Sequence, residues 1–199
     1  MNAFTQRDST LGNIDTGDLV FRMQSRYEMT RILKRVNLFA LHLNKMMKRK
    51  IIDQTELKKY LPDITLDLTS GKKNPLSKLL RIKGIADYDT LETHLVTSRE
   101  AGINGDMHIF GTQVSDMKLD TIRFALSQDT AGVKLFGQVH NSSRNQQYVF
   151  NTFISGRLNE KGADVIWKFF DKNGNTGVNM GLNINALDDG IMIKSSTLD

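Results

Sequence analysis

The sequence predicts an α+β protein that is mainly β: N-terminal amphipathic helices followed by an elongated, curved, antiparallel-rich β-sheet, shaped as a groove or a rolled sheet. Two observations predict this class. Before residue 50, apolar residues recur at steps of three and four, which is the spacing of a helix stripe. After residue 118, apolar and polar residues alternate almost without interruption, which is the period of a strand.

The helical part is expected early in the chain. Its apolar stripe consists of Met29, Ile32, Leu33, Val36, Phe39, Leu43, Met46 and Met47. We expect one helix over residues 18–50 with a break near Asn37, and a second over residues 53–60 with Asp53 as its N-cap. Pro62 ends this part, and the β pattern begins at Ile64.

The β part is expected to have one apolar face and one polar face. Strands in the last third are separated only by short turns, and side chains in a strand point alternately to its two sides. The apolar face is the candidate lipid-binding lining of a groove. Its members are Val133, Leu135, Val139, Phe150, Ile154, Val165, Trp167, Phe169, Val178, Met180, Leu182 and Ile184.

The patterns predict three parts: a flexible N-terminus over residues 1–17, a basic helical segment over 18–62 and a β-groove segment over 63–199. Residues 1–62 hold 12 Lys and Arg against 6 Asp and Glu, a net +6, and the remainder holds 15 against 16, a net −1. The basic helix could face nucleic acid phosphates or anionic lipid head groups. We favour a solvated face, because acidic residues are interspersed and aromatic residues are few, so no nucleic acid partner is expected.

The composition and motifs point away from an enzyme. The chain of 199 residues has no Cys, and no apolar run approaches the length of a membrane span. The turn from Asp171 to Gly177 resembles the start of a calcium loop, but Leu182 stands where a bidentate glutamate belongs, so a hairpin turn is the better interpretation. The four histidines lack metal-ligand spacing. We therefore predict no catalytic residue, no metal and no cofactor.

A series of turn and strand signatures occurs in a fixed order between Asp18 and Lys194, and none is a catalytic motif. They are Leu61-Pro62-Asp63-Ile64, Ser70-Gly71-Lys72-Lys73-Asn74-Pro75-Leu76, Ser98-Arg99-Glu100-Ala101-Gly102-Ile103-Asn104-Gly105, Leu119-Asp120-Thr121-Ile122, Gln128-Asp129, Val139-His140-Asn141, Phe169-Phe170-Asp171-Lys172-Asn173-Gly174 and Met180-Gly181-Leu182. This order resembles the middle of the very long TamB-type proteins, the translocation and assembly modules of the AsmA-like superfamily.

The resemblance implies a location and a function. Members are anchored in the inner membrane and cross the periplasm as a rolled β-sheet, whose apolar inner face is thought to shield phospholipid acyl chains on their way to the outer membrane. Some are linked to outer-membrane protein assembly. The chain would then be an internal periplasmic segment, with phospholipid acyl chains and outer-membrane assembly proteins as partners and its membrane anchor outside this chain.

A second interpretation stays open at this stage. A closed sandwich, in which the apolar face is ordinary core, has the same alternation as an open groove. Such a chain would be a structural or protein-interaction module that docks a partner through its edge strands or its basic helix.

Overall fold

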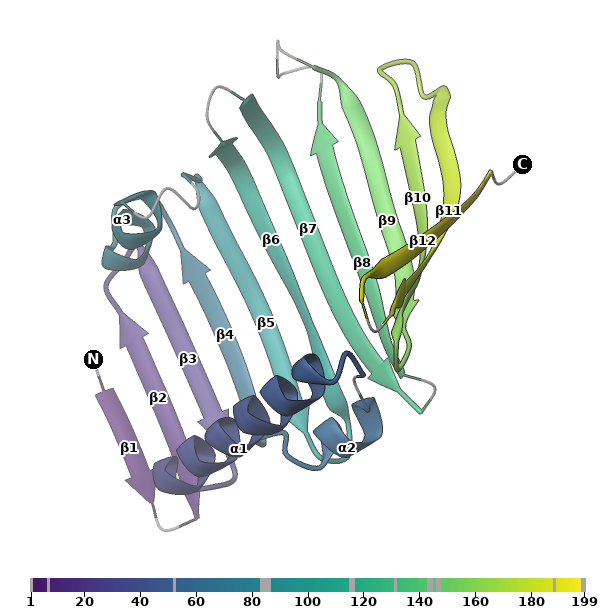
Figure 1. Cartoon of the computed structure of the whole chain (residues 1–199). Helices are drawn as coiled ribbons and strands as arrows, with labels where there is room; N and C mark the ends of the chain where they lie inside the picture. Colours follow the sequence, from purple (N-terminus) through teal and green to yellow (C-terminus); the bar gives the residue numbers. More distant parts are fainter. Residues whose placement is uncertain are drawn as a thin grey trace.

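The structure, a computed structural model, is mainly antiparallel β with a few short helices, as the sequence predicts. It describes residues 2–6, 8–51, 53–82, 87–114, 117–130, 132–142, 145, 148–187 and 189–197. The described strands form one open, curved sheet, in which each strand pairs with its neighbours in the chain (Figure 1). The two termini therefore lie at opposite ends of the sheet.

Twelve strands are present in the described part of the chain, and every neighbouring pair is antiparallel. Short turns make this simple up-and-down order possible, and Gly102 and Gly174 adopt the left-handed conformation that such turns require. The strands are β1 (Asn2–Gln6), β2 (Ser9–Asp15), β3 (Leu19–Ser25), β4 (Ile64–Ser70), β5 (Thr90–Ser98), β6 (Gly102–Val114), β7 (Met117–Asp129), β8 (Gly132–Asn141), β9 (Phe150–Leu158), β10 (Gly162–Phe170), β11 (Thr176–Ala186) and β12 (Ile191–Thr197).

The N-terminal end of the sheet differs from the expectation. The predicted helix start at Asp18 is wrong, because Leu19–Ser25 is strand β3 and helix α1 spans Met29–Lys48 without a break at Asn37. Strands β1 and β2 lie within the segment 1–17 that we expected to be flexible. Helix α1 and the short helix that follows it are thus an insertion between β3 and β4 of one sheet, and do not precede the sheet.

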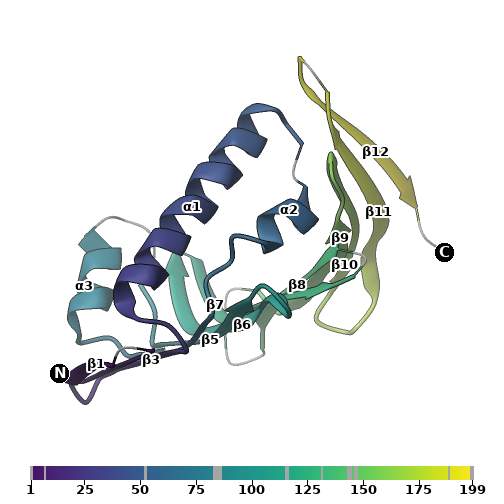
Figure 2. The same cartoon turned by 90° about the horizontal axis from the view of Figure 1, so that it is seen from below.

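The predicted second helix is confirmed. Helix α2 spans Gln54–Lys58, and the Asp53 carboxylate accepts a hydrogen bond of 2.8 Å from the backbone N–H of Glu56. Helices α1 and α2 lie side by side over the concave face of the sheet, near one end of the strands (Figure 2). The side chains of Ile32 and Met46 in α1, and of Leu57 and Leu61 in and after α2, are buried.

A third helix, α3 (Pro75–Ile82), lies at the opposite end of the strands on the same side as α1. Asn74 caps it, because its side-chain oxygen accepts a hydrogen bond of 3.0 Å from the backbone N–H of Ser77. The hydroxyls of Ser70 and Tyr88 are 2.7 Å apart beneath this cap. The Asn74 amide also donates hydrogen bonds of 3.0 Å to the Asp18 carbonyl, just before β3, and to the Ser70 hydroxyl at the end of β4, and so holds α3 to both strands.

The rest of the molecule is a single layer. The strands that the structure describes form one sheet, with no second sheet facing it, so they do not form the closed sandwich. A compact protein of 22.5 kDa would expose about 9,500 Å² of surface. This chain exposes 13108 Å². The excess, about 3,600 Å² against the same scaling law, shows that much of the sheet lacks a covering layer.

Candidate functional site: the apolar concave face

The pairing register places all twelve predicted lining residues on one face of the sheet. Opposite residues in antiparallel strands project to the same side. Val165 lies opposite Leu182, and Trp167 lies opposite both Ile154 and Met180. On one side of this set, Thr152 lies opposite Val139 of β8, and on the other side Ile184 lies opposite Ile193 of β12. The alternation in the sequence therefore converges on one continuous surface across β8–β12.

This face is the concave one, on the side of the helices. The Thr10 and Thr97 hydroxyls, which share the face, donate hydrogen bonds to the backbone oxygens of Tyr27 and Pro62, each at 2.8 Å. Ser25 on the same face donates to the backbone oxygen of Asp63. These three carbonyls belong to the chain that enters and leaves the helical insertion. The apolar side of the sheet and the helices therefore face each other.

The predicted lining is largely uncovered. Of the twelve side chains, only Val133 is buried, and the others are half-buried or exposed. The rings of Phe150 and Phe169 stack with their centres 5.7 Å apart. The Trp167 indole N–H donates a hydrogen bond of 2.8 Å to the Thr152 hydroxyl, so this polar atom is satisfied within the sheet. What remains toward the concave side is mainly apolar.

The apolar face also extends beyond the predicted residues. The register carries it from β8 through Ile122, Ile109, Leu95, Leu66 and Met23 to β2. The alternation in these strands is present in the sequence, but it is interrupted by Thr, Ser and Gly on the same face. The apolar face is therefore wider than the segment for which we predicted a lining role.

Two glycines on this face differ in the space around them, and this difference predicts different effects on stability. A Cβ at Gly156 would lie 2.2 Å from the backbone oxygen of Asp164, whereas a Cβ at Gly137 would lie 4.0 Å from Ile154. We expect Gly156→Ala to lower the free energy of unfolding by about 1–3 kcal/mol, and Gly137→Ala to leave it within about 1 kcal/mol. Urea unfolding of both variants checks this, and equal losses would contradict the register.

The helices close one end of the concave face. The Gln54 side chain joins two strands, because its nitrogen donates to the Leu158 carbonyl at 2.7 Å and its oxygen accepts from the Val133 N–H at 2.6 Å. Beside it is a mainly apolar hollow of about 440 Å³, where the ends of α1 and α2 meet the β9–β10 and β11–β12 turns. Met47, Leu158, Ala186 and Ile191 contribute its apolar wall.

Part of the predicted apolar stripe of helix α1 is exposed and adds to the apolar surface of the molecule. Part of the stripe is buried, but Leu33 is 60% exposed, Met47 is 61% exposed, and Val36 is also exposed. Met47 lines the hollow opposite Ile191, so this edge of α1 faces the curved C-terminal part of the sheet. Figure 2 shows the sheet rising around α1 on that side.

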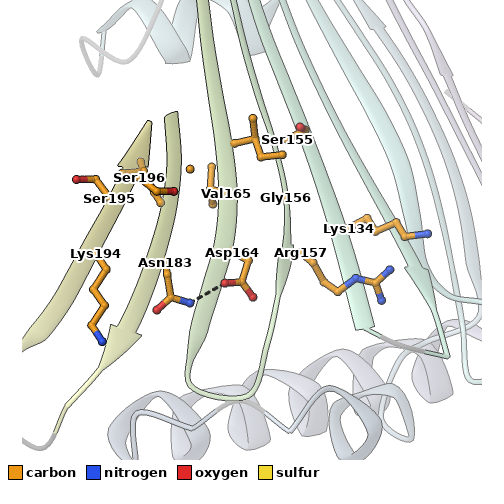
Figure 3. Close-up of a pocket in the computed structure, with 13 residues that line it drawn as sticks. Lys134, Ser155, Gly156, Arg157, Asp164, Val165, Asn183, Lys194, Ser195 and Ser196 are labelled. Carbon is orange, nitrogen blue, oxygen red and sulfur yellow. Dashed lines mark hydrogen bonds between the residues drawn. The ribbon is translucent and has the colours of Figure 1, made fainter. Parts of the chain in front are cut away.

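The convex face has a different character. Lys134, Arg157, Asp164, Asn183 and Lys194 form a polar row across β8–β12, around an open hollow of about 570 Å³ (Figure 3). The Asn183 amide donates a hydrogen bond of 2.6 Å to the Asp164 carboxylate. Lys134 and Arg157 lie 2.8 Å and 3.3 Å from carboxylate oxygens of Asp129. Lys134 and Arg157 are thus paired with a carboxylate along the sheet.

The turn that resembles a calcium loop uses its carboxylate internally. Asp171 accepts hydrogen bonds of 2.8 Å from the backbone N–H groups of Asn173 and Asn175. The hydrogen bond from Asn175 is the largest cause that lowers the pKa of Asp171. Among the described residues, no group of three His, Cys, Asp or Glu side chains is placed to hold a metal ion.

The helices and the comparisons add two findings. Within the described residues, no helix combines the length and hydropathy needed to cross a membrane. A scan of the chain against protein-family models gives no match, and searches among curated proteins and solved structures give none either. The functional interpretation therefore depends on the geometry of the site and on the resemblance in the sequence.

Proposed function

We propose that this chain is a non-enzymatic segment of a periplasmic, envelope-spanning protein of the TamB or AsmA-like type, and that its concave face is part of a hydrophobic groove for phospholipid acyl chains. In this proposal the segment serves phospholipid transport and outer-membrane biogenesis. The observation that carries the proposal is the continuous apolar face across β8–β12, which the described part of the chain covers only near Gln54 and the end of α1.

An uncovered apolar face of this extent needs an occupant. Exposed apolar patches beyond a few hundred Å² normally mark binding sites in soluble proteins. Acyl chains suit this face because their contacts are non-directional, and each methylene removed from water contributes about 0.8 kcal/mol. A conduit needs retention without one deep binding site, and a row of half-buried Val, Leu, Ile and Phe side chains provides that.

The two faces of the same strands explain how a groove could remain dispersed in water. Val165 faces the concave side, whereas Asp164 and Lys168 of the same strand face the convex side. The polar row keeps the outside of the sheet hydrated, while the C-terminal part of the sheet curves around the side on which α1 lies (Figure 2). This division is the one a lipid-shielding sheet requires.

The test is native mass spectrometry of the purified chain with extraction and identification of bound lipid. We expect phospholipid to co-purify. A photo-crosslinking residue at Leu182, on the concave face, should label lipid, whereas the same residue at Asn183, on the convex face, should not. A lipid-free, monodisperse and stable monomer would contradict the proposal, as would equal labelling from the two positions.

A further inference from the structure

A second hollow, lined mainly by cations, lies on helix α1 away from the apolar face. It measures about 570 Å³, and its lining includes Arg31, Lys34, Arg35, Lys59 and Arg99, with Glu28 as the acidic member. These cations come from three separate segments: α1, the end of α2 and the β5–β6 turn. A solvated helix face would not bring in Lys59 and Arg99, so the fold itself concentrates positive charge here.

The hollow and the apolar groove are on different sides of α1. Successive residues turn by about 100° around a helix axis, so Lys34 and Val36 lie about 160° apart. Val36 belongs to the exposed apolar edge with Met47, which lines the hollow beside the sheet. Arg31, Lys34 and Arg35 lie on the far side with α2 and Tyr60. Occupation of one site therefore does not require occupation of the other.

The cations of this hollow are not neutralised by the protein. None of the five forms an ion pair with a carboxylate in the described part of the chain, whereas Arg26 nearby pairs with Asp63 at 2.5 Å. Glu28, the N-cap residue of α1, is the one acidic side chain in the lining, so five cations and the N-terminal end of the helix dipole face a single carboxylate. Like charges gathered in excess over their one counter-charge repel one another, and a bound anion would relieve that repulsion.

Two of the guanidinium groups are held in place before any ligand binds. Arg31 lies over the Tyr27 ring, with its Cζ atom 4.1 Å from the ring centre. The Arg35 guanidinium donates hydrogen bonds of 3.5 Å and 3.4 Å to the backbone oxygens of Lys59 and Leu61. Planar guanidinium groups bind phosphate oxygens in pairs, and lysine ammonium groups add point charges.

From this arrangement we propose that the cationic hollow is a binding site for a phosphate group. The volume lies in the range of small-ligand sites and suits one phosphate ester with its attached polar group. The phosphate can come from a phospholipid head group or from a free phosphorylated molecule. The proposal is independent of the lipid groove, because it rests on other residues on another side of α1.

The test compares two double variants with the same change in charge. Lys34→Gln/Arg99→Gln removes two cations of the hollow from different segments, and spares Arg35, whose hydrogen bonds are internal. Lys45→Gln/Lys48→Gln removes two exposed cations of α1 outside the hollow. Each protein is titrated with glycerol 3-phosphate by calorimetry and mixed with phosphatidylglycerol vesicles in a flotation assay, at two salt concentrations.

We expect the parent to bind with an affinity that falls as salt rises, and the hollow variant to bind at least about tenfold more weakly. The control variant should stay within about twofold of the parent. Saturable binding of glycerol 3-phosphate supports the proposal and identifies a free phosphate as a ligand. Hollow-dependent binding to vesicles alone supports it and identifies a lipid head group.

Three results would overturn the proposal. One is no binding of either probe by the folded parent. Another is an equal loss in the hollow variant and the control variant, because net charge alone would then account for binding. The third is obtained by titrating the same proteins with single-stranded oligonucleotides: binding of these alone, with affinity that grows with their length, would indicate an extended charged surface and not a phosphate site. The lipid content of the same variants, measured by mass spectrometry, shows separately whether the apolar groove still binds lipid.

Discussion

Replacing Val165 by Arg is expected to reduce the phospholipid that co-purifies with the chain at least about tenfold, a difference of about 1.4 kcal/mol or more in retention. Val165 lies in the middle of the concave face, opposite Leu182 on one side and Gly156 on the other. A guanidinium at this position must either keep its water, which excludes an acyl chain, or lose it at a cost of several kcal/mol. Met180→Arg, on the adjacent strand, should act in the same way.

The neighbouring residue provides the control. Ile166 is the next residue of β10, is exposed and projects to the convex face. Ile166→Arg therefore makes the same kind of change on the same strand without altering the concave surface, and lipid retention should stay within about twofold of the parent. Circular dichroism and thermal unfolding confirm that both variants are folded. If Val165→Arg is folded and retains as much lipid as Ile166→Arg, the lining assignment is wrong.

The shared face of the twelve residues could be predicted because its signal is local. From Lys118 to Lys194 the period of two is almost uninterrupted, so the alternation within each strand indicates which of its side chains point inward. Short turns allow only antiparallel neighbours. The pairing register then brings the inward side chains of separate strands next to one another. For example, Ile154, Trp167 and Met180 are neighbours across three strands, although no motif connects them.

The N-terminal strands could not be predicted in the same way. In β2 the inward positions are Thr10, Gly12 and Ile14, and the larger Leu11 points outward, so the usual alternation is reversed at its start. In β3, inward Phe21 is adjacent to outward Val20, and a short apolar cluster of this kind fits a helix turn as well as a strand. Pairing with β4 decides the outcome, and that contact is not local, because paired residues lie between 41 (Gln24 and Thr65) and 51 (Leu19 and Ser70) positions apart.

The helix start and the cationic hollow were missed for related reasons. Glu28 occupies the N-cap position of α1 without a side-chain cap, so no capping residue marks the start. The cations of the hollow were visible individually, but Arg99 joins Lys34 and Lys59 only when the β5–β6 turn is placed beside the helices. A property that depends on three segments meeting in space has no signature in any one of them.

The edge of the sheet leads to the second large expected effect. Strand β12 pairs with β11 on one side, and no described strand pairs with its other side. Ile191 and Ile193 are 71% and 63% exposed on this strand. A free ladder with exposed β-branched side chains is a template for another strand. We therefore expect the isolated chain to self-associate through β12, and Ile193→Lys to weaken that association at least about tenfold.

The comparison that isolates the edge uses an interior strand. Leu11 in β2 is 53% exposed, but β2 is paired on both sides, so Leu11→Lys changes exposed apolar surface and charge without altering a free ladder. Sedimentation velocity over a range of concentrations should show Ile193→Lys shifted toward monomer and Leu11→Lys unchanged. Because the apolar face and the edge meet at Ile193, added phospholipid separates their contributions: lipid that covers the face should not dissociate oligomers joined by the ladder. Dissociation by lipid alone would instead place the contact between concave faces and contradict the edge interpretation.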